Sequence, residues 1–153
     1  MRHLSVDIET FSSNDIGAGV YKYVEAEDFS ILLFAYAYDF GQVEVVDLAQ
    51  GETIPDAVIQ DLQNPDVIKH AYNSLFEITC LNKAGYVTPL RQWHCTMIHG
   101  AYLGGPMGLA KLGVALGLPQ DKLKDKAGKA LIRYFSIPCN PTKSNGGRTR
   151  NLP

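Results

Sequence analysis

The segment that most constrains the fold runs from residue 3 to residue 9, where polar and apolar side chains alternate strictly. Its apolar positions are Leu4, Val6 and Ile8. A period of two over this length predicts a β-strand with one buried face. Asp7 and Glu9 then project together from the polar face, roughly 6.6 Å apart along the strand. The polar segment 11–15 breaks the alternation, so both acids are expected at the C-terminal end of the strand.

This end of a strand is where open α/β sheets build their sites. Two carboxylates in that position can hold a pair of Mg²⁺ or Mn²⁺ ions about 3.5–4 Å apart, the arrangement used for in-line phosphoryl displacement. The alternative interpretation of Asp7-x-Glu9 is an acidic strand end that faces water, because so short a pattern is common by chance.

The next segments predict a hairpin and then strands that alternate with helices. A nearly continuous apolar run over 30–38 and a β-branched run over 43–48 are joined by a short turn, which predicts an antiparallel hairpin. Further elements are expected in this order: a helix over 55–62 with Thr53 as its N-cap, a strand over 66–71, a helix over 75–84 closed by Gly85, a short strand over 91–94, and helices over 96–103, 109–116 and 127–135.

Together these elements predict an α/β fold, with a mixed sheet and helices on its faces. The sheet combines a three-stranded antiparallel meander with parallel strands. The first strand is expected at its centre, because the hairpin pairs on one side and the strand over 66–71 on the other. Residues 12–28, and the chain from residue 136 onward, show no periodicity.

Charge is divided unevenly along the 153 residues, although the net charge is only −2. Residues 1–104 carry five basic and fourteen acidic side chains, whereas residues 105–153 carry nine basic and two acidic ones. Acids that bind metal beside a basic flank that binds phosphate would suit a nuclease. The alternative is a solvated basic helix and tail.

Composition and cysteine usage favour a cytoplasmic protein. No apolar run approaches the roughly 18 residues of a membrane span, and no signal-peptide pattern precedes the first strand. The cysteines are Cys80, Cys95 and Cys139. An odd number of cysteines, scattered along the chain, is typical of reduced thiols and gives no disulfide framework.

A second acidic motif lies where the strand over 66–71 runs into the following helix. Glu77 falls in the first turn of that helix, three residues after Ser74. This spacing fits a capping box, in which Ser74 caps the helix and Glu77 reaches back to the Ser74 N–H. Glu77 is also placed to join Asp7 and Glu9, and the motif alone does not separate the two interpretations.

Taken in order, these motifs resemble the DEDD 3′–5′ exonucleases of the ribonuclease H-like fold, above all the proofreading-type domain of phage DNA polymerases that are similar to DNA polymerase I. The segments that carry the resemblance are Asp7-x-Glu9, Asn73-x-x-Phe76-Glu77, Trp93-x-Cys95-Thr96-Met97, Gly128-Lys129-Ala130-Leu131-Ile132 and Phe135-Ser136-Ile137-Pro138. They span essentially the whole chain. Each is weak alone, and their combination and order are specific.

The resemblance implies a metal-dependent exonuclease that acts on single-stranded DNA 3′ ends, with Mg²⁺ or Mn²⁺ as cofactor. It assigns Asp7, Glu9 and Glu77 as catalytic metal ligands, with Asp7 bridging both ions. The substrate-binding residues it implies are Thr10, Phe11, Asn73 and Phe76. From the basic flank we add Lys126 and Lys129 to this set. Of these, Phe76 would stack on the terminal base.

One part of the family pattern has no match here, namely a Tyr or His followed four or five residues later by Asp. After Glu77 the only acids are Asp121 and Asp125, and neither has that spacing. We therefore expect residues 1–138 to be an incomplete exonuclease domain, residues 139–153 an irregular basic tail, and a polymerase domain to be a partner outside this chain. The alternatives are a catalytically incomplete fragment that binds nucleic acid or packs on a polymerase, and a structural α/β domain.

Overall fold

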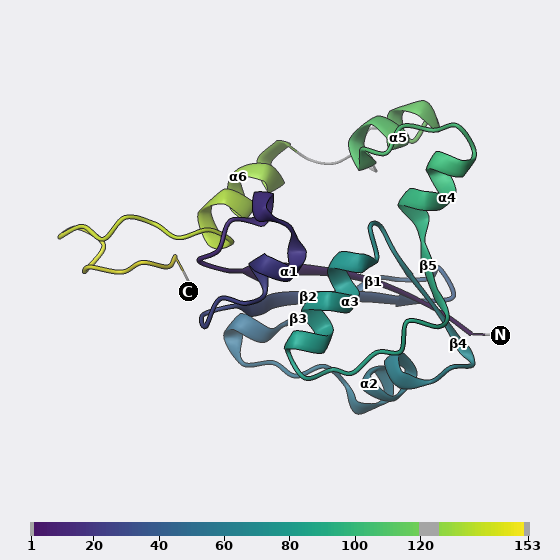
Figure 1. The fold of residues 1–153 in the computed structure, drawn as a ribbon, viewed down its shortest axis with the longest axis horizontal. Helices are drawn as coiled ribbons and strands as arrows, with labels where there is room; N and C mark the ends of the chain where they lie inside the picture. The colour runs from purple at the N-terminus through teal and green to yellow at the C-terminus, as the bar shows by residue number, and fades with distance from the viewer. Residues whose placement is uncertain (1, 120–125, 152–153) are drawn as a thin grey trace.

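The computed structural model describes residues 2–119 and 126–151, which form one five-stranded sheet with helices on both faces (Figure 1). The strand order is β3-β2-β1-β4-β5. The strands are β1 (Arg2–Phe11), β2 (Ser30–Tyr38), β3 (Glu44–Asp47), β4 (Val67–Ala71) and β5 (Trp93–Cys95). The ribonuclease H-like mixed sheet expected from the sequence is therefore confirmed.

Strand β1 lies at the centre, as its alternation predicted. It pairs antiparallel with β2, where Asp7 faces Ala35, and parallel with β4, where Ser5 faces His70. Strands β3 and β5 extend the sheet antiparallel to β2 and parallel to β4. The meander and the parallel strands thus meet on β1.

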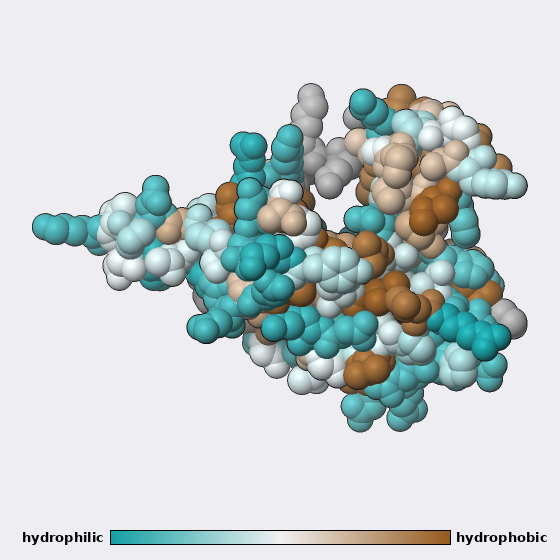
Figure 2. Space-filling model, in the orientation of Figure 1, coloured by the Kyte–Doolittle hydropathy of each residue, from teal (hydrophilic) through white to brown (hydrophobic). Residues whose placement is uncertain are grey.

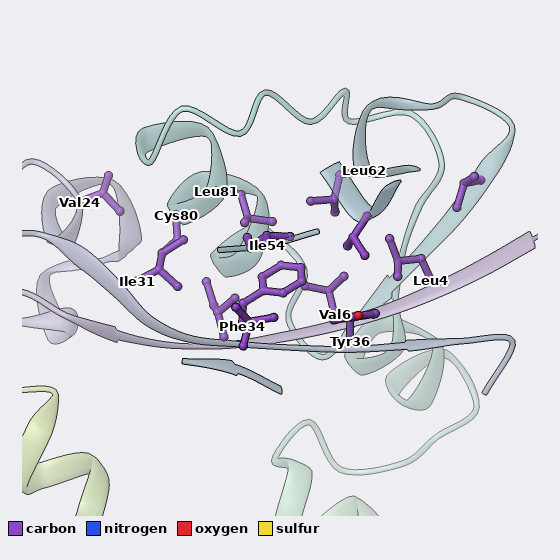
Figure 3. Close-up of a cluster of buried hydrophobic side chains, with 14 of the residues drawn as sticks. Leu4, Val6, Val24, Ile31, Phe34, Tyr36, Ile54, Leu62, Cys80 and Leu81 are labelled. Atoms are coloured by element: carbon purple, nitrogen blue, oxygen red, sulfur yellow. The ribbon is translucent and has the colours of Figure 1, made fainter. Parts of the chain in front are cut away.

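The two faces of the sheet differ in what covers them. Leu4 and Val6 point into the main core together with Phe34, which is fully buried (Figure 3). Ile8 belongs to the same core. Helices α2 (Asp56–Gln63) and α3 (Leu75–Lys83) close this core face. Because strand side chains alternate, the residues of β1 between these positions emerge on the opposite, second face.

The second face carries the remaining long helices. Helix α6 (Lys126–Phe135) lies over β2 and β3, and α4 (Thr96–Tyr102) packs on β4 and β5. Helix α5 (Leu109–Ala115) follows α4 in a lobe set apart from the sheet, with exposed apolar side chains on its surface (Figures 1 and 2). No helix in the described part of the chain is long and apolar enough to cross a membrane.

Several local expectations need correction. The N-cap of α2 is Pro55, which makes no side-chain capping bond, so Thr53 is not the cap. Proline is favoured at a helix start, because the backbone N–H that it lacks would have no partner within the helix there. The segment 12–28 is not wholly irregular, since Ile16–Ala18 forms a 3-10 turn and Val20–Tyr23 forms α1. Gly85 does follow α3 with φ +91°, as expected for a helix end.

Residues 136–151 contain no helix or strand, yet side-chain hydrogen bonds order this segment, which projects from the body (Figure 2). Asn145 organises the loop: its amide donates to the Asn140 and Arg148 carbonyls, and its carbonyl accepts from the Thr142 N–H. The chain then returns to the sheet, where Arg150 lies 3.9 Å above the Phe11 ring.

We predict that Phe34→Ala lowers the free energy of unfolding by about 3–5 kcal/mol, because the lost ring leaves a cavity in a core that cannot fully collapse. Urea denaturation followed by circular dichroism measures the change. The matched control is Val45→Ala on the neighbouring strand, whose side chain is exposed; it should cost no more than about 0.5 kcal/mol. Equal losses in both variants would contradict this location of the core.

Candidate functional site

Asp7 and Glu9 lie on the second face of β1, near its C-terminal end. Asp7 is exposed and Glu9 is half-buried. The residue beside Asp7 on β2 is Ala35, a small side chain that leaves the carboxylate accessible. Directly after Glu9 the pairing with β2 shifts register, so the strand is irregular where the acidic pair ends. Bulges of this kind occur often beside active sites, where they redirect side chains.

Glu77 lies in the first turn of α3 and is only 3% exposed. Its Oε2 atom has no hydrogen-bond partner among the described residues. A buried carboxylate oxygen without a partner is costly, by about 1–3 kcal/mol or more when charged. It is therefore a group that a proton or a cation would stabilise.

The surroundings of Glu77 raise its pKa to about 8. Burial is the main cause; the hydrogen bond from its own backbone N–H works against it, and the negative charges of Asp7 and Cys95 add to the rise. Asp7 and Glu77 are thus neighbours in electrostatic terms. The negative charge of Asp7 thus disfavours the ionisation of Glu77.

The capping box predicted as the alternative role of Glu77 is not formed. Ser74 adopts helical dihedral angles and makes no side-chain capping bond at the start of α3. Burial acts to raise the pKa of Cys95, but the backbone groups of Ile98, Ser74 and Asn73 and the Ser74 hydroxyl favour the thiolate and lower that pKa. Glu77 therefore has no capping role to account for its position.

The donors present fit a divalent cation only in part. The unpartnered oxygen of Glu77 beside the charge of Asp7 is the kind of oxygen environment that Mg²⁺ or Mn²⁺ prefers. Within the described ranges, however, no group of three or more His, Cys, Asp or Glu side chains is arranged to hold a metal ion. A cation bound by Asp7 and Glu77 would complete its coordination with water or with ligands from outside these ranges.

Glu9 lines a separate hollow beneath α6. The hollow has a volume of about 320 Å³ and is mostly apolar, with Leu33, Leu131 and Phe135 among its walls. Lys129 stands exposed on the same helix, whereas the side chain of Lys126 lies outside the described residues. The structure thus puts part of the basic flank on the same face as the acidic pair.

The four remaining substrate-binding candidates differ in accessibility. Thr10 is buried and its hydroxyl hydrogen-bonds the Tyr23 hydroxyl at 2.9 Å, and Phe11 is buried beneath Arg150. Asn73 is exposed and has φ +65°, a left-handed conformation that asparagine tolerates well. Phe76 is half-buried, with its ring 6.0 Å from that of Tyr23. In this structure only the last two reach the surface.

The contact made by Arg150 was not predicted from the sequence. Its guanidinium covers Phe11 and donates to the Ser30 hydroxyl at 2.7 Å, which ties the C-terminal segment to the end of β1. No local pattern signals a contact between residues so far apart in sequence. Asp121 and Asp125, the late acids of the sequence, lie outside the described residues.

Comparisons with known proteins support the resemblance drawn from the sequence. No protein-family model matches the chain. Over its whole length the chain is 57% identical to a DNA polymerase of Bacillus phage SP02, and it spans about a quarter (24%) of that polymerase.

Solved structures show the same fold. NrnC of Brucella melitensis is 16% identical with a TM-score of 0.60, over 81% of this chain and 55% of that one. A second NrnC structure, with bound Mg²⁺, is 14% identical with a TM-score of 0.58, over 86% of this chain and 71% of that one. At this level of identity the likeness concerns the fold alone.

We predict that the metal-free protein loses stability as the pH rises from about 4.5 toward 8. The folded state holds the Glu77 proton up to a pKa of about 8, whereas the unfolded state releases it near 4.5, so the folded state binds more protons across this window. Thermal unfolding in EDTA across this pH range measures the loss. Glu77→Gln should flatten the profile, and Glu27→Gln, at an exposed position, should not. An unchanged profile in Glu77→Gln would contradict the raised pKa.

Proposed function

We propose that this chain is the 3′–5′ exonuclease domain of a phage-type DNA polymerase, and that it removes nucleotides from single-stranded DNA 3′ ends with Mg²⁺ or Mn²⁺. The observation that carries the proposal is the buried, unpartnered carboxylate oxygen of Glu77 beside Asp7. Fold alone would not support a reaction, since one fold serves many functions. This pair of acids supplies the chemistry that the fold leaves open.

In the proposed site, Asp7 and Glu77 hold the cation and Glu9 contributes from the same strand. Divalent ions bound there would neutralise the scissile phosphate, lower the pKa of the attacking water and stabilise the leaving 3′-oxygen. Glu77 enters this state by giving up the proton that burial otherwise retains. Cation binding therefore releases a proton and becomes stronger as the pH rises.

The terminal nucleotide is proposed to bind next to the turn between β4 and α3. Asn73 is exposed there, and Phe76 is half-buried. Lys129, exposed on α6 over the second face, would attract the phosphate backbone. Thr10 and Phe11 would support the end of β1 from below, since both are buried.

The missing third motif is proposed to come from the longer polypeptide. The phage relative is about four times as long as this chain, so it has room both for a further acid and for a polymerase domain. In the family pattern that acid binds metal, and the Tyr or His before it orients the attacking water. NrnC structures carrying Mg²⁺ or the dinucleotide pGG support the proposed cofactor and substrate class.

The alternative function is a catalytically incomplete domain that binds nucleic acid or packs on a polymerase. The absence of any three-ligand group within residues 2–119 and 126–151 is the observation that favours it. The two functions share the fold and differ in whether a cation is held and a phosphodiester bond is broken. The two predictions below separate them.

We predict that millimolar Mn²⁺ raises the melting temperature of the 153-residue chain by a few degrees, because a ligand bound only by the folded state stabilises it. Asp7→Ala should abolish the shift, and so should Glu77→Gln. Glu27→Ala, which removes an exposed acid from another surface, should retain it. An equal shift in all four proteins would mean that Mn²⁺ binds elsewhere.

We predict that the 153-residue chain degrades single-stranded DNA about 10²- to 10⁴-fold more slowly than a polypeptide extended through the third motif, which is the typical contribution of a general base. The assay follows a 5′-labelled oligonucleotide with Mg²⁺ and with Mn²⁺, since stepwise shortening from the 3′ end reports direction. Asp7→Ala should abolish the activity of the extended polypeptide. Full activity in the short chain would show that a further ligand lies within it, with Asp125 the first residue to test.

A further inference from the structure

We propose that a row of five aromatic rings on the second face, here called the ring row, binds the bases of single-stranded DNA upstream of the cleaved end. The ring row consists of Phe40, His3, His70, His94 and His99. It contains all four histidines of the chain. The inference rests on the proposed function, because it supplies the path by which a single strand would reach Asp7 and Glu77.

The ring row is continuous from one side of the sheet to the other. Phe40 stands 5.2 Å from His3 and 5.4 Å from His70, measured between ring centroids. His3 and His70 stack at 5.1 Å with an interplanar angle of 26°, and their facing Nδ1 and Nε2 atoms are 2.9 Å apart. His70 then meets His94 at 5.4 Å, and His94 meets His99 at 5.6 Å.

Strand register puts the ring row on the same face as the acids. His3 and Asp7 are four residues apart on β1, before its irregularity, so their side chains share a face roughly 13 Å apart. His70 lies beside Ser5, and His94 beside His70, in parallel ladders that extend this face.

The backbone at Phe40 is held in an unfavourable conformation that serves the ring row. Asp39 and Phe40 both have positive φ, at 48° and 60°, in a turn closed by the hydrogen bond from the Gly41 N–H to the Tyr38 carbonyl. Left-handed backbone suits glycine or asparagine and is strained for a bulky aromatic residue. Yet Phe40 is 69% exposed, so burial of its ring does not explain it. Strain of this kind concentrates at functional sites.

The chemistry of the ring row matches flat nucleobases better than it matches metal ions. Its histidines belong to no group of three that could hold a metal ion within the described residues. Burial, then the neighbouring His3, His94 and His99, lower the pKa of His70, which favours its uncharged ring. Aromatic side chains stack on any base, which suits an enzyme that must accept every sequence.

The test compares Phe40→Gly and Phe40→Asn with the unaltered chain. Both variants accept the left-handed backbone, so melting temperatures should stay the same or rise. Affinity for a 5′-labelled twelve-residue oligo(dT), measured by fluorescence anisotropy in EDTA, should fall roughly five- to a hundredfold, as expected when one stacked base loses its platform. The slope of log affinity against log salt should not change, because no phosphate contact is lost.

The matched control is Tyr102→Ala, which removes a ring that is 90% exposed on α4 but stands outside the ring row; its affinity should be unchanged. The ring row is overturned if the Phe40 variants bind as tightly as the unaltered chain, if Tyr102→Ala weakens binding equally, or if the unaltered chain fails to bind the oligonucleotide at millimolar concentration. Cleavage by the Mn²⁺-loaded extended polypeptide tests the nuclease separately. If binding depends on Phe40 but no cleavage occurs, the proposed role of the ring row is supported and the proposed exonuclease activity is contradicted.

Discussion

The strict alternation of β1 at the centre of the sheet is the constraint on which the rest of the structure depends. Burial of Leu4, Val6 and Ile8 contributes several kcal/mol, at roughly 1.5–3 kcal/mol for each large apolar side chain. A slip of one residue would reverse every side chain, so register and the placement of Asp7 and Glu9 are selected together. Burial of the apolar face of β1 in the core therefore holds Asp7 and Glu9 on the opposite face of the sheet.

Glu77 shows the opposite relation between stability and function. Its buried carboxyl has an oxygen without a partner, and its pKa rises to about 8, so the metal-free fold carries a group that is costly to ionise at neutral pH. A cation beside Asp7 would relieve this cost, which makes binding and folding favour the same state. Phe40 is a second local conflict, because its ring is exposed while its backbone is strained. Conflicts that folding does not need are the features that point to function.

Much of the fold could be predicted because its signals are local. The period of two in β1, the apolar run of β2 and the Gly85 helix end each depend on neighbours in sequence, and each is confirmed. The expected N-cap at Thr53 was wrong, since Pro55 begins α2 without a side-chain cap. For Glu77 the local pattern fitted two roles, and only the structure removed the capping box, because Ser74 makes no side-chain capping bond at the start of α3.

By itself, the sequence determined the order of strands and helices, the central place of β1 and the common face of Asp7 and Glu9, because these follow from side-chain periodicity. Only the tertiary structure decided that Glu77 is buried where the charge of Asp7 raises its pKa, that Arg150 covers Phe11 and that four histidines join Phe40 in one row. These contacts join residues distant along the chain, and they depend on how strands pair and how the chain folds back. No local pattern of residue types encodes these long-range contacts.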